Sequence, residues 1–437
     1  MVEVNDGRHF KNPYQDYMPG DQLKVGDTNI PNKIVELLNV LNSNFEKLSS
    51  SDVSMYTGLS GVGLFYNFLS QCKCELLDRK IRENGVVCTE KLLNRCLRHI
   101  DLKKLSKNIS VYTSPIGPLC LGALSSIKHG SENTEAKKFV EDILSASKYG
   151  LDVDCGMPDE ALYGRTGYLN CLITLRENNF DIPVSVVSSI TDAILKSGQK
   201  TAGAYKSNGF YNRLMYQSSK RDLCMPPLMF EWHDKCYLGG AHGFAGILTT
   251  LLKVYRLFPG SISSHSLNQL ILPTVDWMSQ LQIISGNWPS SLGDSLNRDV
   301  LVHWCHGATG VIPLMLSAHK ITGENKYLKC ALDGGEAVWT RGLLHKGCGL
   351  CHGSAGSGFA LLEIYQTTQD PKYLYRAMKV GVSSVTVFAE WCTDCFKNAT
   401  RVADRPYSLM EGLAGTLYFL VGILDPVNSK FPLLSGL

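Results

Sequence analysis

Two similar segments, HWCHGATG (His303–Gly310) and GLCHGSAG (Gly349–Gly356), carry the pattern that decides the fold. Each contains a Cys-His-Gly triplet, and in each a second glycine follows three residues after the first. This G-x-x-G element recurs along the chain, with the first glycine replaced in one copy. The copies are GLSG (Gly58–Gly61), SPIG (Ser114–Gly117), GRTG (Gly164–Gly167), GFAG (Gly243–Gly246), GATG (Gly307–Gly310), GSAG (Gly353–Gly356) and GLAG (Gly412–Gly415).

The spacing of these copies indicates a helical repeat. Their final glycines lie 46 to 79 residues apart, which fits one helical hairpin per repeat with loops of variable length. The text between copies has helical periodicity, as in the stripe Ile34, Leu37, Leu38 and Leu41. Each copy precedes an apolar run with few charges, which is typical of a buried helix. The sequence predicts an all-α fold of seven hairpins, with inner helices ringed by outer amphipathic ones and the helix-start loops gathered at one end.

Composition limits the class of protein. We expect one domain over residues 1–437, with an N-terminal extension of about residues 1–30 and an exposed polar insertion loop of about residues 200–224. A net charge of +3 is too small to argue for nucleic acid as a partner. The polar N-terminus is not a secretory signal, and the longest apolar run is too short for a transmembrane segment. We expect a soluble, cytoplasmic protein; a peripheral position at the plasma membrane stays open.

The cysteines suggest metal binding rather than disulfides. There are 15, an odd number, which argues against a secreted disulfide framework. Zinc favours thiolate and imidazole donors, and the two Cys-His pairs offer both. Four ligands would make a closed structural site and three would leave a catalytic position open, but the residues alone do not say which of Cys305, His306, Cys351 and His352 coordinate. They could also be core residues beside tight glycine turns.

A second cysteine pattern competes with this interpretation. Cys348–Cys351 and Cys392–Cys395 are both C-x-x-C, which a four-thiolate zinc site or a redox pair would use. The segment between them is longer than in a zinc ribbon and has the pattern of two helices.

Other polar residues occupy the same place in other repeats. His242 precedes GFAG directly, as His306 and His352 precede their copies, and could transfer a proton near pH 7 or simply cap its helix. Glu411 has the related position before GLAG, and the segment Glu160–Tyr163 comes before GRTG. Arg165, inside GRTG, offers a bidentate grip on an anion.

These motifs, in this order, resemble the eukaryotic LanC-like proteins, relatives of the bacterial lanthionine synthetase C cyclases. The resemblance runs from Arg8–Tyr17 to Lys430–Leu434, nearly the whole chain. The motifs that carry it are LYGRTGYL, PLMFEWHDKCYLGGAHGFAGI, LVHWCHGATGVI, GLLHKGCGLCHGSAG and PYSLMEGLAGT. The resemblance implies a two-layered α/α toroid with seven inner helices. It also implies one zinc ion bound by Cys305, Cys351 and His352, with the fourth position open and His306 a neighbour.

The resemblance further implies a zinc-dependent thiol addition. Glutathione, the co-substrate, would add to dehydroalanine or dehydrobutyrine in proteins or peptides, including residues left when phosphate is lost from phosphoserine or phosphothreonine. His242 would transfer the proton, Lys346 and Arg8 would bind glutathione, and Arg165 and Glu411 are further candidates for substrate binding. Partners would be glutathione, dehydroamino-acid or phosphorylated substrates, and signalling proteins. The alternative is a non-catalytic glutathione-binding or signalling adaptor with a zinc site.

The sequence departs from the family pattern in three places, one of which is the Lys200–Cys224 stretch, longer than expected and placed to cover or extend a substrate entrance. SPIG replaces the usual glycine-rich second repeat, which puts the shape of that loop in question. Cys348 stands where the family often has an aromatic residue or proline, and its oxidation with Cys351 would remove a metal ligand.

Overall fold

The computed structural model describes residues 7–21, 28–126, 134–216, 218, 220–382 and 405–437. Over these residues the chain is helical, with isolated β-bridges and no extended strand. The helices are α1 (Ile30–Ser43), α2 (Leu59–Gln71), α3 (Arg79–His99), α4 (Ile116–Ser125), α5 (Thr134–Ser145), α6 (Arg165–Glu177), α7 (Val184–Ser207), α8 (Phe210–Met215), α9 (Phe244–Leu257), α10 (Ser264–Ser266), α11 (Leu272–Gln280), α12 (Ala308–Thr322), α13 (Asn325–Arg341), α14 (Ser354–Thr368) and α16 (Leu413–Ile423). Within the described part of the chain, no helix combines the length and the apolar character that crossing a bilayer requires.

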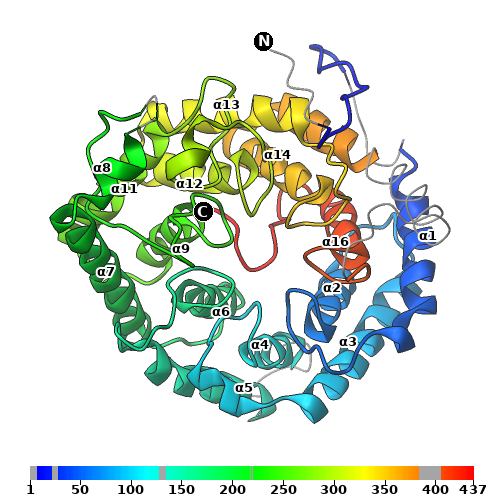
Figure 1. The fold of residues 1–437 in the computed structure, drawn as a ribbon. Coiled ribbons are helices and arrows are strands. Elements are labelled where there is room, and N and C mark those ends of the chain that lie inside the picture. The colour runs from blue at the N-terminus through cyan, green and yellow to red at the C-terminus, as the bar shows by residue number, and fades with distance from the viewer. Residues whose placement is uncertain (1–6, 22–27, 127–133, 217, 219, 383–404) are drawn as a thin grey trace. The chain divides into compact units, whose positions relative to one another are not determined.

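The chain divides into two compact units. The first comprises Met1–Asp101, Leu121–Ala136 and Val338–Phe431, and the second Leu102–Cys120, Lys137–Ala337 and Pro432–Leu437. In the first unit α2 packs against α3 and α16, and α16 also contacts α14 and α1 (Figure 1). In the second unit α9 packs against α6 and α12, while α7 lies against α6 and α11 against α12 (Figure 1). The single domain expected over residues 1–437 stays a prediction.

Each G-x-x-G copy starts a buried helix. In the six strict copies the first glycine is the N-cap of α2, α6, α9, α12, α14 or α16, as the repeat pattern predicts. In the seventh copy α4 begins at Ile116, whose N–H donates to Oγ of Ser114 at 3.1 Å. A serine hydroxyl therefore caps the helix where the first glycine is missing.

The repeat helices and the outer helices differ in burial, as expected. Every residue of α16 is buried, which accounts for its uniformly apolar sequence. Helix α1 instead buries one stripe and exposes the opposite face; the stripe consists of Ile30, Ile34, Leu37, Leu38 and Leu41.

The final glycine of each strict copy allows the chain to fold back on itself. A Cβ atom built on it would lie only 1.9–2.1 Å from the carbonyl oxygen six residues earlier, a distance that no side chain tolerates. Gly246 against the carbonyl of Gly240, and Gly310 against that of Trp304, are examples. The motif is therefore required by packing of backbone on backbone at the start of each helix.

Backbone hydrogen bonds connect these helix-start loops to one another. In the first unit the N–H of Cys351 donates to the carbonyl of Met410 at 2.7 Å, and the N–H of Met410 donates to that of Tyr56 at 3.1 Å. In the second unit Gly240 donates to Trp304 at 3.0 Å, and Ala161 donates to Ala241 at 3.1 Å. Within each unit the loops are thus gathered side by side, as the repeat analysis predicts.

The expected insertion loop at residues 200–224 is wrong for most of its length. Residues 200–207 are the last turns of α7, and Phe210–Met215 form α8. Tyr205 and Tyr211 are buried, and Nε1 of Trp277 donates to the hydroxyl of Tyr211 at 3.0 Å. The exposed Lys200, Gly203, Lys206 and Ser207 mark the solvent face of α7, whereas Tyr205 and Tyr211 pack inward.

The glycine packing can be tested with a matched pair of substitutions. Gly246→Ala in α9 should lower the free energy of unfolding by about 3 kcal/mol or more, because its methyl group meets backbone that cannot yield. Gly203→Ala in α7, where a Cβ meets no atom within 4 Å, should raise it by roughly 0.5–1 kcal/mol through helix propensity. Urea unfolding measures both, and equal effects would contradict the packing argument.

Candidate metal centre and active site

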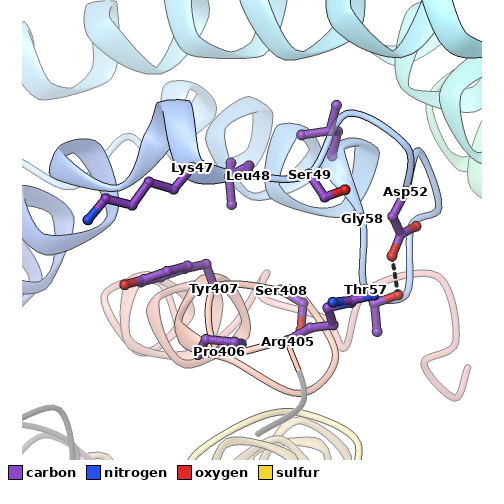
Figure 2. A pocket seen from close by; sticks show the side chains of 11 residues that line it. Lys47, Leu48, Ser49, Asp52, Thr57, Gly58, Arg405, Pro406, Tyr407 and Ser408 are labelled. Atoms are coloured by element: carbon purple, nitrogen blue, oxygen red, sulfur yellow. Dashed lines mark hydrogen bonds between the residues drawn. The ribbon is translucent and has the colours of Figure 1, made fainter. Parts of the chain in front are cut away.

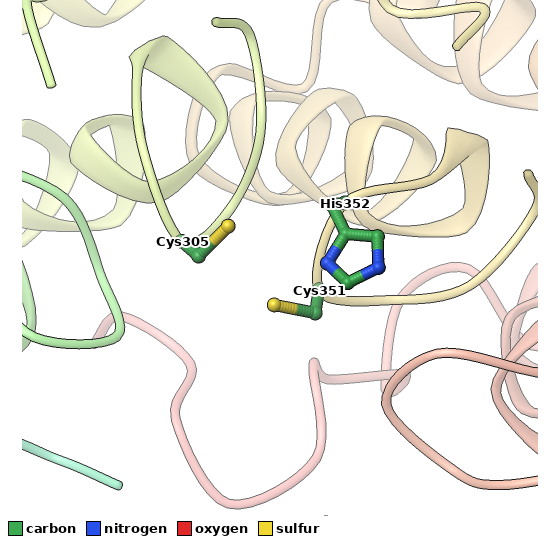
Figure 3. Close-up of side chains that lie close together, drawn as sticks. All are labelled: Cys305, Cys351 and His352. Atoms are coloured by element: carbon green, nitrogen blue, oxygen red, sulfur yellow. The ribbon is translucent and has the colours of Figure 1, made fainter. Parts of the chain in front are cut away.

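Three predicted ligands lie together. The Sγ atoms of Cys305 and Cys351 and a ring nitrogen of His352 are within 4.8 Å of one another (Figure 3). Cys351 is buried and the other two are half-buried. Two thiols and an imidazole are the donor types that zinc prefers, so the side chains fit a metal ion with three protein ligands. His306 is not in this group; its ring packs on Tyr237 with the ring centroids 5.4 Å apart.

Tyr56 is a site residue that the sequence analysis missed. Its hydroxyl donates to Sγ of Cys351 at 2.9 Å, and a hydrogen bond to a thiolate favours the charged sulfur. Tyr56 stands two residues before the first glycine of GLSG, the register that Cys305 and Cys351 have in their own copies. That shared register was the available signal.

The neighbouring cysteine Cys348 is not suited to act as a thiolate ligand of a metal ion. No disulfide joins Cys348 to Cys351. Burial raises the pKa of Cys348 to about 12, so this thiol stays neutral at physiological pH. Cys392 and Cys395, the other half of the alternative cysteine pattern, lie outside the described residues.

His242 is held by a buried carboxylate. Its Nδ1 lies 2.7 Å from Oε2 of Glu160, which also accepts the backbone N–H of Leu162 at 2.9 Å. Glu160 is 2% exposed, whereas the imidazole of His242 is 23% exposed. The carboxylate thus fixes one ring nitrogen, and Nε2 is the atom through which this histidine can exchange a proton.

The backbone places His242 beside the loop of Cys305. A Cβ on Gly239 would lie 2.0 Å from the carbonyl oxygen of Cys305, so these two loops touch through backbone alone. The ring of Tyr237 lies 5.9 Å from that of His242 and, as noted, also packs on His306. One ligand and the candidate proton donor are therefore held in a fixed relation.

Arg8 and Lys346 come from distant parts of the chain and are brought close in the backbone. The N–H of His345 donates to the carbonyl of Arg8 at 3.0 Å, and the N–H of Phe10 donates to that of Leu343 at 2.7 Å. Both cationic side chains are exposed. The structure thus joins the two predicted glutathione-binding residues on one edge of the loop that leads to Cys351.

An N-terminal strap, residues 7–21, maintains this pairing. Nε and Nη2 of Arg376 bind the two carboxylate oxygens of Asp16 at 2.8 and 2.5 Å. The guanidinium is buried and lies over the rings of Trp339 and Tyr373. Asn12 adds a hydrogen bond from Nδ2 to the carbonyl of Trp339 at 2.8 Å.

The prediction that Arg165 binds substrate is wrong. Its side chain is fully buried, and it donates to the carbonyls of Gly150, Met157 and Asp152 and to the carboxylate of Asp159. Through these hydrogen bonds the guanidinium joins the segments before GRTG. The side chain of Arg165 is therefore not available to bind an anion from solvent.

Glu411 remains a candidate. It is half-buried, and its backbone packs against Gly349, where a Cβ would lie 2.6 Å from the carbonyl of Glu411.

A separate cavity of about 240 Å³ lies in the first unit (Figure 2). The carboxylate of Asp52 accepts a hydrogen bond from the hydroxyl of Thr57 at 2.7 Å at one side of it. None of the sequence-predicted site residues lines this cavity. Its lining consists of Lys47, Leu48, Ser49, Asp52, Thr57, Gly58, Leu59, Arg405, Pro406, Tyr407 and Ser408.

Comparisons with known proteins agree with the family resemblance found in the sequence. The family model described as lanthionine synthetase C-like protein matches residues 49–435. A protein from Danio rerio named glutathione S-transferase LANCL1 is 35% identical over 447 residues, which cover 98% of this chain and 99% of that protein. The solved structure of a nisin cyclase matches with a TM-score of 0.54 at 14% identity, over 92% of this chain and 95% of that one.

The chain therefore belongs to the lanthionine synthetase C-like family. The structural match to the nisin cyclase confirms the predicted fold class, the all-α, α/α toroid of that family.

The strap should respond to acid. The hydrogen bond from Arg376 holds the pKa of Asp16 below its ordinary value, so the pair contributes stability above that value and loses it as pH falls through the lowered pKa. We expect the backbone amides of Phe10 and His345 to lose hydrogen-exchange protection below about pH 4. Asp16→Asn should cause the same loss at pH 7, whereas Asp21→Asn, which alters another strap carboxylate, should not. Retained protection in Asp16→Asn would contradict the anchoring role.

Proposed function

We propose that this protein is a zinc-dependent enzyme that adds the thiol of glutathione to dehydroalanine or dehydrobutyrine residues in proteins or peptides. The observation that carries the proposal is the group of two thiols and one imidazole formed by Cys305, Cys351 and His352. Three protein donors leave one position of a tetrahedral site for an incoming thiol. The name of the Danio rerio relative supports glutathione as that thiol, and the relationship to a nisin cyclase supports a C–S bond-forming reaction on a peptide.

The ligand side chains would place the metal ion, and Tyr56 supports one of them. When bound, zinc supplies a positive charge that lowers the pKa of a coordinated thiol, so that the thiolate forms at neutral pH. Cys305, Cys351 and His352 are the residues that would hold the ion. The hydroxyl of Tyr56 stabilises the negative sulfur of Cys351.

His242 and Glu160 serve the second half of the reaction. As the glutathione sulfur bonds to the β-carbon, the C=C π bond breaks and negative charge develops at the α-carbon and its carbonyl. His242 donates a proton from Nε2 to the α-carbon, while Glu160 holds Nδ1 and balances the positive ring. The proton lost by the thiol replaces the one donated, so the net change is addition of S–H across the double bond with no oxidant or reductant.

Arg8 and Lys346 provide charge for glutathione. Glutathione carries two carboxylates, and both residues are exposed cations that the strap holds near the loop of Cys351. Glu411, at the corresponding position before GLAG, would contact the ammonium group or the peptide acceptor.

A second function from a different class is a glutathione-binding or signalling adaptor that keeps a zinc site without turnover. For either function we propose a location in the cytoplasm. For the enzyme, phosphorylated proteins would be the sources of the acceptor residues. The pairing of His242 with a buried carboxylate favours the enzyme, because a binder has no use for an oriented proton donor.

Mass spectrometry of a dehydroalanine peptide incubated with protein, zinc and glutathione separates the two functions. An adduct with the mass of glutathione, formed faster than without protein, supports the enzyme. An adduct formed only at the background rate, with glutathione still bound, supports the adaptor.

The ligand assignment predicts about one zinc ion per chain. Cys305→Ala, Cys351→Ala and His352→Ala should each lose most of the metal, because each removes one of three protein ligands. His306→Ala is the matched control and should keep it. Metal analysis of the purified variants decides this, and depletion in His306→Ala equal to the others would favour a closed four-ligand site.

The acid assignment predicts a slow but metallated variant. His242→Asn should keep zinc and fold but slow adduct formation by roughly 100-fold, within the range that a positioned acid contributes. Glu160→Gln should slow it in the same direction and by less, because the imidazole stays but its orienting charge is lost. Rates are measured at saturating glutathione with zinc content in parallel. An unchanged rate in fully metallated His242→Asn would remove this residue from the mechanism.

A further inference from the structure

An aromatic surface surrounds the candidate proton donor. The rings of Tyr163, Trp232 and His242 have centroids 5.8, 6.2 and 6.4 Å apart in pairs. The planes of Tyr163 and His242 are parallel to within 2°, and Trp232 deviates from them by 22° and 21°. Three nearly equal separations exclude a single column, in which the outer rings would lie twice as far apart as neighbours. The rings therefore form one cluster of similarly oriented faces, here called the aromatic patch.

The aromatic patch is partly open to solvent. Tyr163 is 41% exposed, an unusual state for a large aromatic side chain, and Trp232 is half-buried. Both lie in the same unit as His242. Tyr163 stands one residue before the first glycine of GRTG, the register that His242 has in GFAG, which explains their parallel rings.

A tight turn places Trp232 at this position. Trp232 and Lys235 exchange both backbone hydrogen bonds, at 2.9 and 3.2 Å, so His233 and Asp234 are the two central residues of a hairpin. Their φ angles are +48° and +59°, the left-handed region that such a turn requires and that residues other than glycine rarely adopt. The following residues are fixed by pairing of Tyr237 with Ser291. The turn thus fixes the position of Trp232.

We propose that the aromatic patch binds the planar dehydroamino-acid unit of the acceptor, with Tyr163 and Trp232 as residues that recognise its conjugated C=C–C=O plane. The inference rests on the proposed function, since it uses His242 as the proton donor. Nδ1 of His242 is engaged by Glu160, so the proton must leave from Nε2, and the rings of Tyr163 and Trp232 are aromatic faces that lie beside this imidazole. An sp² unit presents a flat apolar face to an aromatic ring, and a saturated residue does not.

This assignment explains how the site distinguishes substrate from product. Addition of the thiol converts the planar unit into a tetrahedral α-carbon, which can no longer lie flat against a ring. Stacking therefore favours the acceptor before proton transfer and weakens once the product forms. The metal ligands and the charges for glutathione, Arg8 and Lys346, are not part of the aromatic patch, so acceptor and thiol recognition should separate experimentally.

The test compares binding of two peptides by calorimetry in the absence of thiol, so that no turnover occurs. The probes are a dehydrobutyrine peptide and the same peptide with 2-aminobutyrate. Wild-type protein should bind the unsaturated peptide roughly 3- to 10-fold more tightly, the size of an aromatic stacking contribution. Trp232→Leu and Tyr163→Leu should lose this preference, whereas Tyr163→Phe, which keeps the ring, should retain it. Asp234→Gly, which relieves the turn without changing a ring, should retain it too.

Kinetics provide the second readout. With a dehydrobutyrine substrate, Trp232→Leu should raise the KM for peptide by a similar factor and leave the KM for glutathione and the zinc content unchanged. Equal binding of both peptides by folded wild type, or a preference that survives in both leucine variants, would overturn the proposal. If wild type distinguishes the peptides yet forms no adduct, the aromatic patch stands and the proposed reaction fails.

Discussion

The structure depends on one repeated contact, the final glycine of each G-x-x-G copy lying against a carbonyl six residues earlier. The contact leaves no room for a side chain, and it folds the loop so that a helix starts immediately after the first glycine. It also exposes the backbone of the loop to its neighbours. The N–H of Cys351 and the carbonyl of Met410 can meet because each loop is already folded back in the same way.

The chemistry of the site follows from this repetition. Residues one and two positions before the first glycine belong to the folded-back loop, and the candidate functional side chains occupy these positions in several copies. Cys305, Cys351 and Tyr56 share one register, and His242 and His352 share the other. A carboxylate outside the register, Glu160, then orients His242 from the neighbouring repeat. Because the copies fold in the same way, side chains that are far apart in sequence occupy equivalent positions at the starts of their helices.

The repeated elements of the structure could be predicted from the sequence, whereas several side-chain contacts could not. The repeat helices were predictable from glycine spacing, and ligand type pointed to Cys305, His306, Cys351 and His352. The choice of Cys305, Cys351 and His352 among these four came from the resemblance to the family. Arg165 was misassigned because a motif position does not reveal that nearby carbonyls will occupy the guanidinium. Residues 200–215 were misassigned because their polar composition marks an exposed helix face as readily as a loop. The strap could not be predicted, because the ion pair between Asp16 and Arg376 joins residues that are far apart in the sequence.

The backbone linkage between loops has a consequence for how such a protein can change. The hydrogen bonds at Tyr56, Cys351 and Met410 use only main-chain atoms, so the scaffold places little demand on the identity of those side chains. A mutation there can alter chemistry at small cost to folding, whereas a mutation at the glycine five positions later places a side chain against backbone. Within each copy, the residues that can change the chemistry and the glycines that maintain the fold are thus close neighbours in sequence. At these positions of each copy, a single substitution can introduce a new metal donor, acid or aromatic group without changing the helix that follows.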